Sequence, residues 1–279
     1  MLPIIHTRQL SDTVFEMGVL APDIARRVQP GQFLMLRLDE GGERIPLTFS
    51  DWSAEEGWIR TIYMRVGKTT HRLSHLVPGD EIADVVGPLG VPTRLDGFGR
   101  VAVVGGGVGV AAAYPVARGM TEAGCEVHVI VGARNAGLVV LEQELRALSL
   151  ASLAIVTDDG SAGEKGLVTA PLKRMAETGS IDHVFAVGPA AMMKSCTLTA
   201  EGFGMPITVS LNPIMVDGTG MCGACRVSVG GETRFGCVDG PDFDGHAVDW
   251  EEFMSRQRIY LDEEREADAE FARSCSCHT

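Results

Sequence analysis

Two cysteines in a glycine-rich loop have the spacing of a metal or redox site. The stretch VDGTGMCGACRV (216–227) places Cys222 and Cys225 two residues apart, and Cys237 follows across a predicted hairpin. Redox disulfides, structural zinc sites and iron–sulfur clusters all use such a pair. A thioredoxin-like disulfide sits at the start of a helix, whereas this loop leads into a strand. The three cysteines therefore favour a metal site that still needs a fourth ligand.

Asp217 stands where a [2Fe–2S] loop holds its first ligand, five residues before Cys222. The array reads Asp217-x4-Cys222-x2-Cys225-x11-Cys237, close to the spacing of plant-type clusters. A carboxylate oxygen is an acceptable, harder ligand for iron. Structural zinc commonly uses two closely spaced pairs, and the second pair is missing here. We therefore expect a [2Fe–2S] cluster, with zinc as the weaker alternative.

The other four cysteines are not assigned to this site. Cys125 and Cys196 are isolated in the sequence, so we expect ordinary core residues. Cys275 and Cys277 lie beside His278 at the end of the chain. A frayed tail is expected there in preference to a metal-binding tip.

Composition limits the classes of partner. The chain has 279 residues, 45% of them hydrophobic, and a formal net charge of −13. Such an acidic chain is a poor binder of nucleic acid or of an anionic membrane. The first residues lack the pattern of a signal peptide, and no segment has the ~20 apolar residues of a membrane span. We expect a cytoplasmic enzyme with no nucleic-acid or membrane partner.

A glycine turn near residue 100 has the pattern of a nucleotide site. RVAVVGGGVGV (100–110) places Gly105, Gly107 and Gly109 where a buried strand turns into a helix. Glycines allow a pyrophosphate to approach the backbone, and the helix start supplies N–H donors. A tight packing turn would need the same residues, so the turn alone is a weak signal.

The next strand departs from the usual dinucleotide fingerprint. It ends in VGARN, with Arg134 where an acidic residue would hold the ribose hydroxyls. Later strand ends supply Asp158 and Asp159, and then Gly188 and Pro189. Because parallel strands bind ligands at their carboxyl ends, we expect these residues to complete a site for NAD(H). Arg134 could instead read the 2′-phosphate of NADP(H).

The surrounding pattern predicts a β + α/β fold in three parts followed by a tail. Residues 1–98 contain strand-like runs at 31–38 and 58–66 and a short strand within 77–90, as in an antiparallel β-barrel. From residue 99 to 211, short apolar runs alternate with helical patterns, which predicts a parallel-sheet nucleotide-binding α/β domain. The strands are expected at 126–134, 153–159 and 183–189, and the helices at 139–149, 168–179 and 190–202.

The C-terminal part has a different residue pattern from the two parts before it. Residues 212–249 hold the cysteine loop and two short strands joined through Gly230 and Gly231, which predicts a small [2Fe–2S] hairpin module. Residues 250–279 are charged and helical, and a surface helix with a tail is expected.

A barrel followed by a nucleotide domain resembles the ferredoxin–NADP reductase superfamily, and one barrel segment resembles its flavin motif. The segment is ERIPLTFSD (43–51). The resemblance implies that the barrel binds FAD. Arg44 would pair with the pyrophosphate, Pro46 and Leu47 would pack on the ring, and Thr48 would reach its polar edge.

A second segment, YMRVGKTTHRL (63–73), resembles the second flavin element of that superfamily. The resemblance implies that Tyr63 and Arg65 meet the ribityl and adenosine side of FAD. It also implies that the turn containing Gly67, Thr69 and Thr70 offers backbone and hydroxyl donors to phosphate.

A closer resemblance covers the chain up to about residue 255. SLNPIMVDGTGMCGACRV and CVDGPDFDGHAVD resemble the small subunit of NADH-dependent reduced ferredoxin:NADP oxidoreductase, also known as the sulfide dehydrogenase beta subunit. The related electron-transfer subunit of class 1B dihydroorotate dehydrogenase has cysteine at the position of Asp217. The resemblance implies an electron-bifurcating complex with a larger FAD/[4Fe–4S] flavoprotein subunit, which exchanges electrons with ferredoxin. No residue of this chain is then needed as a general acid or base.

Two other functions remain open from the sequence. The first is electron transfer to a different partner, such as a dihydroorotate dehydrogenase or a sulfide dehydrogenase-like complex. The second is a non-catalytic scaffold subunit that holds zinc between residues 217 and 237.

Overall fold

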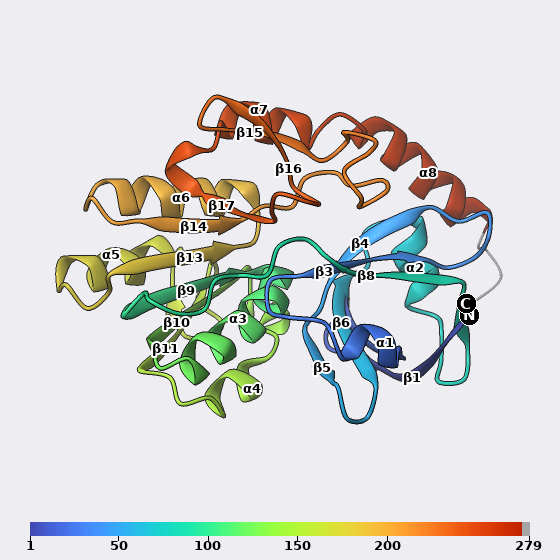
Figure 1. The fold of residues 1–279 in the computed structure, drawn as a ribbon, viewed down its shortest axis with the longest axis horizontal. Helices are drawn as coiled ribbons and strands as arrows, with labels where there is room; N and C mark the ends of the chain where they lie inside the picture. Colours follow the sequence, from blue (N-terminus) through green and yellow to red (C-terminus); the bar gives the residue numbers. More distant parts are fainter. Residues whose placement is uncertain (275–279) are drawn as a thin grey trace.

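The computed structural model describes residues 1–274, and its N-terminal part is an antiparallel β-barrel (Figure 1). One sheet has the order β5-β6-β2-β1-β7 and the other β4-β3-β8. Met17, Leu34 and Phe49 are buried in the core between them, as the alternating apolar pattern requires. The elements are β1 (Leu2–Gln9), β2 (Val14–Leu20), α1 (Pro22–Ala25), β3 (Phe33–Arg37), β4 (Arg44–Thr48), β5 (Asp51–Ser53), β6 (Trp58–Met64), α2 (Lys68–Leu73), β7 (Glu81–Ile82) and β8 (Asp84–Leu89).

A seven-stranded sheet forms the second part, in the order β12-β11-β10-β9-β13-β14-β17. Neighbouring strands are parallel except for β17, which is antiparallel to β14. The chain order reverses at β9, which lies between β10 and β13, and this is where doubly wound sheets bind nucleotides. The strands are β9 (Arg100–Gly106), β10 (Glu126–Ala133), β11 (Ser152–Thr157), β12 (Glu164–Lys165), β13 (His183–Val187), β14 (Ile207–Ser210) and β17 (Asp242–Asp244).

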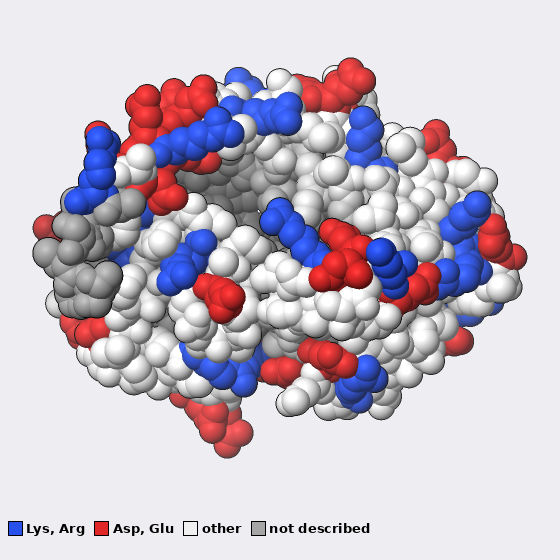
Figure 2. Space-filling model, turned by 180° about the vertical axis from the view of Figure 1, so that it is seen from behind, with Lys and Arg blue, Asp and Glu red and all other residues white. Residues whose placement is uncertain are grey.

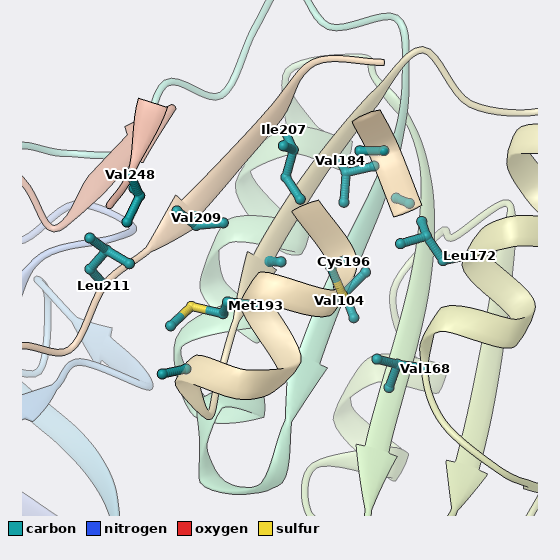
Figure 3. Close-up of a cluster of buried hydrophobic side chains, with 14 of the residues drawn as sticks. Val104, Val168, Leu172, Val184, Met193, Cys196, Ile207, Val209, Leu211 and Val248 are labelled. Atoms are coloured by element: carbon teal, nitrogen blue, oxygen red, sulfur yellow. The ribbon is translucent and has the colours of Figure 1, made fainter. Parts of the chain in front are cut away.

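Helices cover both faces of this sheet, which is why its central strands are continuously apolar. On one face, Val104, Val184 and Val209 of three strands pack with Met193 and Cys196 (Figure 3). Cys196 is therefore the core residue that the sequence predicted. The helices of this part are α3 (Val110–Glu122), α4 (Glu142–Arg146), α5 (Thr169–Glu177) and α6 (Ala190–Glu201), with 3-10 turns η1 (Gly107–Gly109) and η2 (Ala136–Leu138).

The C-terminal segment extends across both preceding parts (Figure 1). The predicted hairpin forms around Gly230 and Gly231, and strand β17 then joins the nucleotide sheet beside β14. Helix α7 packs on α6, and α8 reaches α2 of the barrel, where the rings of His71 and Phe271 meet. The elements are β15 (Arg226–Val229), β16 (Glu232–Phe235), η3 (Gly245–Ala247), α7 (Trp250–Arg256) and α8 (Leu261–Ser274).

The predicted fold class is confirmed, with local differences. The helix expected at 139–149 begins only at Glu142, because Leu141 adopts a left-handed backbone conformation with φ 59°. Residues 77–90 contain two strands instead of one. Cys125 is only half-buried. Cys275, Cys277 and His278 lie outside the described residues.

None of the helices within residues 1–274 is long and apolar enough to cross a membrane.

Candidate functional site

The glycine turn lies at the carboxyl edge of the nucleotide sheet, as expected. Gly105 pairs with Val131 on one side and Val187 on the other, so three strand ends are level. Gly107 has φ +55°, which favours glycine. At Gly109, a Cβ atom would lie 2.7 Å from the Val187 carbonyl oxygen. Only glycine therefore lets α3 begin this close to β13.

The other predicted nucleotide residues lie at strand ends along the same edge of the sheet. Gly188 follows β13 with φ +153°, and Pro189 caps the start of α6. Asp158 and Asp159 follow β11, where the Asp159 N–H donates to the carbonyl of Arg134 at 3.3 Å. All three of these polar residues are exposed. The turn and these strand ends thus border one edge of the sheet.

Within this edge, Asp159 is already engaged. Its Oδ1 accepts from the Ser161 hydroxyl at 2.6 Å and the Ser161 N–H at 2.9 Å. These hydrogen bonds hold the pKa of Asp159 below its ordinary value, and the bond from the Ser161 hydroxyl has the larger effect. No hydrogen bond to the Asp158 carboxylate is found among the described residues. Asp158 therefore has the freer carboxylate for a ribose hydroxyl.

The first predicted flavin segment is strand β4. Its Arg44 and Pro46 side chains are exposed, while Leu47 and Thr48 are half-buried. A strand next to solvent with apolar and cationic side chains can accept both a flavin ring and its pyrophosphate. The residues present on β4 therefore fit FAD.

The turn at Gly67 leads into α2. A Cβ atom on Gly67 would meet nothing within 4 Å, so space remains beside its backbone. The Thr70 hydroxyl accepts from the N–H groups of Val66 and Gly67, at 3.0 and 3.1 Å. The buried Thr69 hydroxyl donates to Glu43. Because both threonine hydroxyls already have partners, phosphate contacts here would fall to backbone N–H groups.

Tyr63 and Arg65 differ in accessibility. The Tyr63 ring is buried in the barrel core and stacks on Phe15 at 6.1 Å. Burial raises the pKa of its hydroxyl well above the ordinary value. Arg65 is half-buried, lies over the same Phe15 ring and donates to the Asp12 carbonyl. Of this predicted pair, only Arg65 presents a charged side chain to a ligand.

The molecule is hollowed on the face shown in Figure 2. The hollow lies between the barrel and the C-terminal helices, and charged side chains of both signs surround it. An elongated cofactor with a pyrophosphate requires such a concave surface.

The four predicted cluster ligands form two pairs. The sulfur atoms of Cys225 and Cys237 lie 3.1 Å apart, and both cysteines are free and buried. Asp217 lies against the backbone of Cys222, whose N–H donates to Oδ2 at 2.9 Å. Its Oδ1 accepts from the Thr219 N–H at 2.7 Å. The pKa of Asp217 lies below its ordinary value. The hydrogen bond from the Thr219 N–H has the largest effect, and the contacts with Cys222 add to it.

The structure brings the predicted ligands together in pairs and does not bring all four around one centre. No set of three or more His, Cys, Asp or Glu among the described residues is arranged to hold one metal. A structural zinc ion needs four ligands around one centre, whereas each iron of a [2Fe–2S] cluster takes two from the protein. Burial, and then the neighbouring Cys225 thiol, raises the pKa of Cys237 to about 12. A bound metal would supply the positive charge that stabilises two adjacent thiolates.

Two barrel residues that the sequence did not single out support the cluster loop. Phe33 and Met35 of β3 pack with Cys225 and Cys237 in one apolar group. A Cβ on Gly218 would lie 2.6 Å from Cγ of Met35, so loop and barrel are in close contact. Met35 is also paired with Pro46 of β4, the predicted flavin strand. The hydrophobic run at 31–38 predicted burial, but nothing in it indicated this neighbour.

The outer side of the loop is exposed and apolar. Cys222 is exposed, and the adjacent Met221 has 88% of its surface exposed. Val216 and Val238 are exposed by 53% and 43%. Exposed apolar groups of this kind mark surfaces that bind other proteins.

Comparison with known families agrees with this geometry. A model described as the iron-sulfur cluster binding domain of dihydroorotate dehydrogenase B matches residues 212–249, and an oxidoreductase NAD-binding domain matches residues 103–197. A Thermotoga maritima protein named as a homologue of the dihydroorotate dehydrogenase B (NAD(+)) electron transfer subunit is 48% identical over 262 residues, which are 94% of this chain and 92% of the relative. The corresponding electron transfer subunit of Geobacillus thermodenitrificans is 33% identical, over 87% of this chain and 95% of the relative.

Solved structures give the same picture. A chain from the structure of the NADH-dependent reduced ferredoxin-NADP oxidoreductase, described for flavin-based electron bifurcation, is 45% identical with a TM-score of 0.91. The match covers 98% of both chains. A ferredoxin NADP+ reductase from Neisseria gonorrhoeae with bound FAD and NADP is 15% identical with a TM-score of 0.61, over 73% of this chain and 90% of that one, and shows a shared fold.

Proposed function

Because this chain belongs to the family of dihydroorotate dehydrogenase B electron-transfer subunits and their homologues, we propose that it carries electrons between NAD(H) and a larger flavoprotein subunit. The chain is an oxidoreductase subunit with sites for FAD, NAD(H) and an iron–sulfur cluster. We assign it to an electron-bifurcating, NADH-dependent ferredoxin:NADP oxidoreductase, whose partner subunit would hold FAD and [4Fe–4S] clusters.

One observation supports this assignment: Asp217 stands five residues before Cys222, at the position proposed for the first ligand of the cluster loop. Two backbone N–H groups, of Thr219 and Cys222, hold the Asp217 carboxyl group and keep its pKa below the ordinary value. In the dihydroorotate dehydrogenase subunits, cysteine is expected at this position. The match to the bifurcating enzyme over 98% of both chains supports the same choice.

The described residues have separable tasks. The backbone around Gly107 and Gly109 would hold the nucleotide pyrophosphate, and Asp158 would accept from ribose hydroxyls. On the barrel, Arg44 would neutralise the flavin pyrophosphate while Pro46 and Leu47 exclude water from the ring. When bound, FAD supplies the conversion between two-electron and one-electron transfer that a pyridine nucleotide cannot perform.

Electrons would leave the molecule through the cluster loop. Met35 connects the two sites, because it packs with Cys225 and Cys237 and pairs with Pro46 of β4. Met221 and Val238 are exposed beside Cys222, where a partner chain would exclude water from the cluster. The partner would therefore bind over residues 216–222 and 238.

Co-purification from the native source, followed by reconstitution, tests the proposed complex. We expect a larger flavoprotein with [4Fe–4S] clusters to co-purify. The reconstituted pair should reduce both NAD+ and ferredoxin from NADPH. A pair that instead oxidises dihydroorotate, and does not turn over ferredoxin, would establish the second candidate function, which the names of the relatives favour.

Metal and flavin analysis of the purified chain tests the scaffold alternative. We expect one FAD and about two irons per chain, the stoichiometry of a [2Fe–2S] protein. A colourless protein with zinc and no flavin would contradict the electron-transfer function altogether.

The preference for NAD(H) or NADP(H) depends on Arg134 and Asp158, which follow the neighbouring strands β10 and β11. Both residues are exposed at neighbouring strand ends, so a cation and a carboxylate compete for the adenosine ribose. We propose NAD(H), because Asp158 accepts from two free hydroxyls whereas a 2′-phosphate would lie against its charge. Hydride-transfer rates with NADH and NADPH decide this, and a large preference for NADPH would contradict it.

A further inference from the structure

A cavity of about 160 Å³ lies apart from the nucleotide turn and the predicted flavin strand. Phe185, Thr208 and Asp242 of three adjacent sheet strands line it, together with Met120 of α3. The remaining lining residues are Asp239 and part of the segment that connects β8 to β9: Val91, Pro92, Thr93, Arg94 and Phe98. All three parts of the molecule therefore meet around this cavity.

Asp242 gives the cavity an unsatisfied hydrogen-bond acceptor. Its Oδ2 accepts from the Thr93 hydroxyl at 2.5 Å. Its Oδ1 is buried and accepts no hydrogen bond within 3.5 Å among the described residues, although the Ser210 hydroxyl is near enough to lower the pKa of the carboxyl group. A buried acceptor without a donor is costly, so a ligand that brings an N–H group would be stabilised here.

The other polar groups limit the kind of ligand. The Thr208 hydroxyl is paired with the His183 ring at 3.0 Å. Arg94 lies over the Phe98 ring and 3.5 Å from the exposed Asp96, so its charge is partly compensated outside the cavity. Asp239 adds a second carboxylate at the edge of the cavity. Asp239 is exposed and already accepts from the Phe235 N–H at 2.6 Å, but the lining still holds two carboxylates and one guanidinium, which favours a cation over an anion.

The apolar lining and the size define the rest of the ligand. Phe98, Phe185, Met120 and Pro92 form an apolar wall beside the carboxylate. Aromatic rings and aliphatic side chains suit both a cation and a short hydrocarbon body. The volume is too small for a nucleotide.

We propose that this cavity binds a compact organic cation, a primary ammonium group on a short apolar chain. The ammonium donates to Oδ1 of Asp242, and the apolar body packs against the Phe98 and Phe185 rings. Such a ligand would join the segment before β9 to strand β17. These two are already linked by the Val91 N–H, which donates to the Gly240 carbonyl at 2.7 Å, and by Thr93 and Asp242. The proposal does not depend on the identity of the partner subunit.

Calorimetric titration of the full chain with its cofactors tests the proposal, with 3-methylbutylamine and 4-methylpentanoate as probes. The two probes share the same branched body and differ in the charged group. At pH 8 we expect the amine to bind and the acid not to bind. Asp242→Asn keeps an acceptor for Thr93 but removes the charge, and should weaken amine binding at least about tenfold. Glu177→Gln, on the exposed side of α5 and not among the lining residues, is the matched control and should leave binding unchanged.

A second variant guards against misfolding of Asp242→Asn. Val91 lines the cavity and is half-exposed, so Val91→Trp narrows the entrance without touching the carboxylate. It should also weaken amine binding, while flavin reduction by NADH stays at the wild-type rate. Equal binding of the acid and the amine would overturn the proposal. Unchanged amine affinity in Asp242→Asn, or no amine binding at all, would overturn it too.

Discussion

Two ligand sites border the seven-stranded sheet, and they are shaped in different ways. We call the strands up to β13 the nucleotide half of the sheet, and β14 and β17 with the loop after β14 the cluster half. In the nucleotide half, the backbone is packed so closely that a Cβ on Gly109 would overlap the Val187 carbonyl. In the cluster half, the loop after β14 is held by two hydrogen bonds to Asp217, by the barrel contact through Met35 and by two thiols in contact. Sheet packing thus shapes the first site, whereas in the second a bound metal would be needed to stabilise two adjacent thiolates.

Removing a buried cysteine is the strongest test of this difference. If the proposed ligand set is right, Cys225→Ser or Cys237→Ser should abolish almost all cluster iron, because each thiol would supply one of only four ligands. Electron delivery to the partner should fall at least about 100-fold, while NADH should still reduce the flavin. Iron analysis, visible absorption and stopped-flow flavin reduction measure the three properties. Cys125→Ser is the control, since Cys125 is half-buried and away from the loop. Full iron content in both ligand variants would disprove the assignment.

Adding one methyl group at Gly109 should impair NADH binding without affecting the cluster. Gly109→Ala places Cβ 2.7 Å from the Val187 carbonyl and forces the start of α3 away from β13. Displacement of the pyrophosphate-binding turn should raise the KM for NADH about 10- to 100-fold, with unchanged iron content. Steady-state reduction of a dye by NADH measures this change.

The control for this variant is Gly124→Ala. Gly124 has φ +88° at the other end of α3 and open space around it, so the substitution strains the backbone without changing the turn. It should lower stability by about 1 kcal/mol and leave the KM unchanged. If both variants raise the KM equally, the close approach at Gly109 is not what shapes the site.

Much of this comparison could be predicted from the sequence, because it rests on local patterns. The run of apolar residues before Gly105 predicted a buried strand and its turn, and the spacing of Asp217 with the cysteines predicted a four-ligand array. The long-range contacts were not predictable in this way. Nothing local to Asp242 indicates that β17 joins the sheet beside β14, and nothing in β3 indicates that Met35 contacts the cluster loop. Alternation along β6 places the Tyr63 ring in the barrel core, which the resemblance to a flavin motif did not indicate, and its contact with the flavin stays a prediction.

The role of Asp217 can be separated from that of the cysteines by substitution. Asp217→Ala removes the acceptor for two N–H groups and would also remove the proposed ligand, so it should reduce iron content about tenfold. Asp217→Cys should keep the cluster but change its midpoint potential and EPR spectrum, because a thiolate is a softer ligand. Thr219→Ala is the matched control, because the backbone N–H that binds Asp217 remains. Unchanged content and spectrum in Asp217→Ala would show that this carboxylate is not a ligand.

The smallest expected effect concerns one titrating group from each half of the sheet. Burial, reinforced by Arg94, lowers the pKa of His183 in β13 to about 4. Burial raises the pKa of Asp242 in β17 to about 6, against the opposing effect of the Thr93 and Ser210 hydroxyls. The folded state therefore disfavours the charged form of both groups.

The two groups make stability depend on pH with opposite signs. The contribution of neutral His183 is complete above pH 6.5, the ordinary pKa, and is lost as the pH falls towards 4. The contribution of protonated Asp242 is complete below pH 3.8, the ordinary pKa, and is lost as the pH rises through about 6. Between these limits the two effects have opposite signs, so we expect them largely to cancel in the wild-type protein.

Single substitutions should reveal how each group makes the free energy of unfolding depend on pH. Asp242→Asn should lose about 1–3 kcal/mol relative to wild type as the pH falls from 6.5 to 4.5, because His183 is then uncompensated. His183→Gln should show the opposite slope, losing stability relative to wild type as the pH rises over the same range. Urea unfolding at several pH values measures both, with exposed His75→Gln as the control. Parallel profiles for wild type and both variants would mean that neither half of the sheet holds its titrating group in an uncharged form.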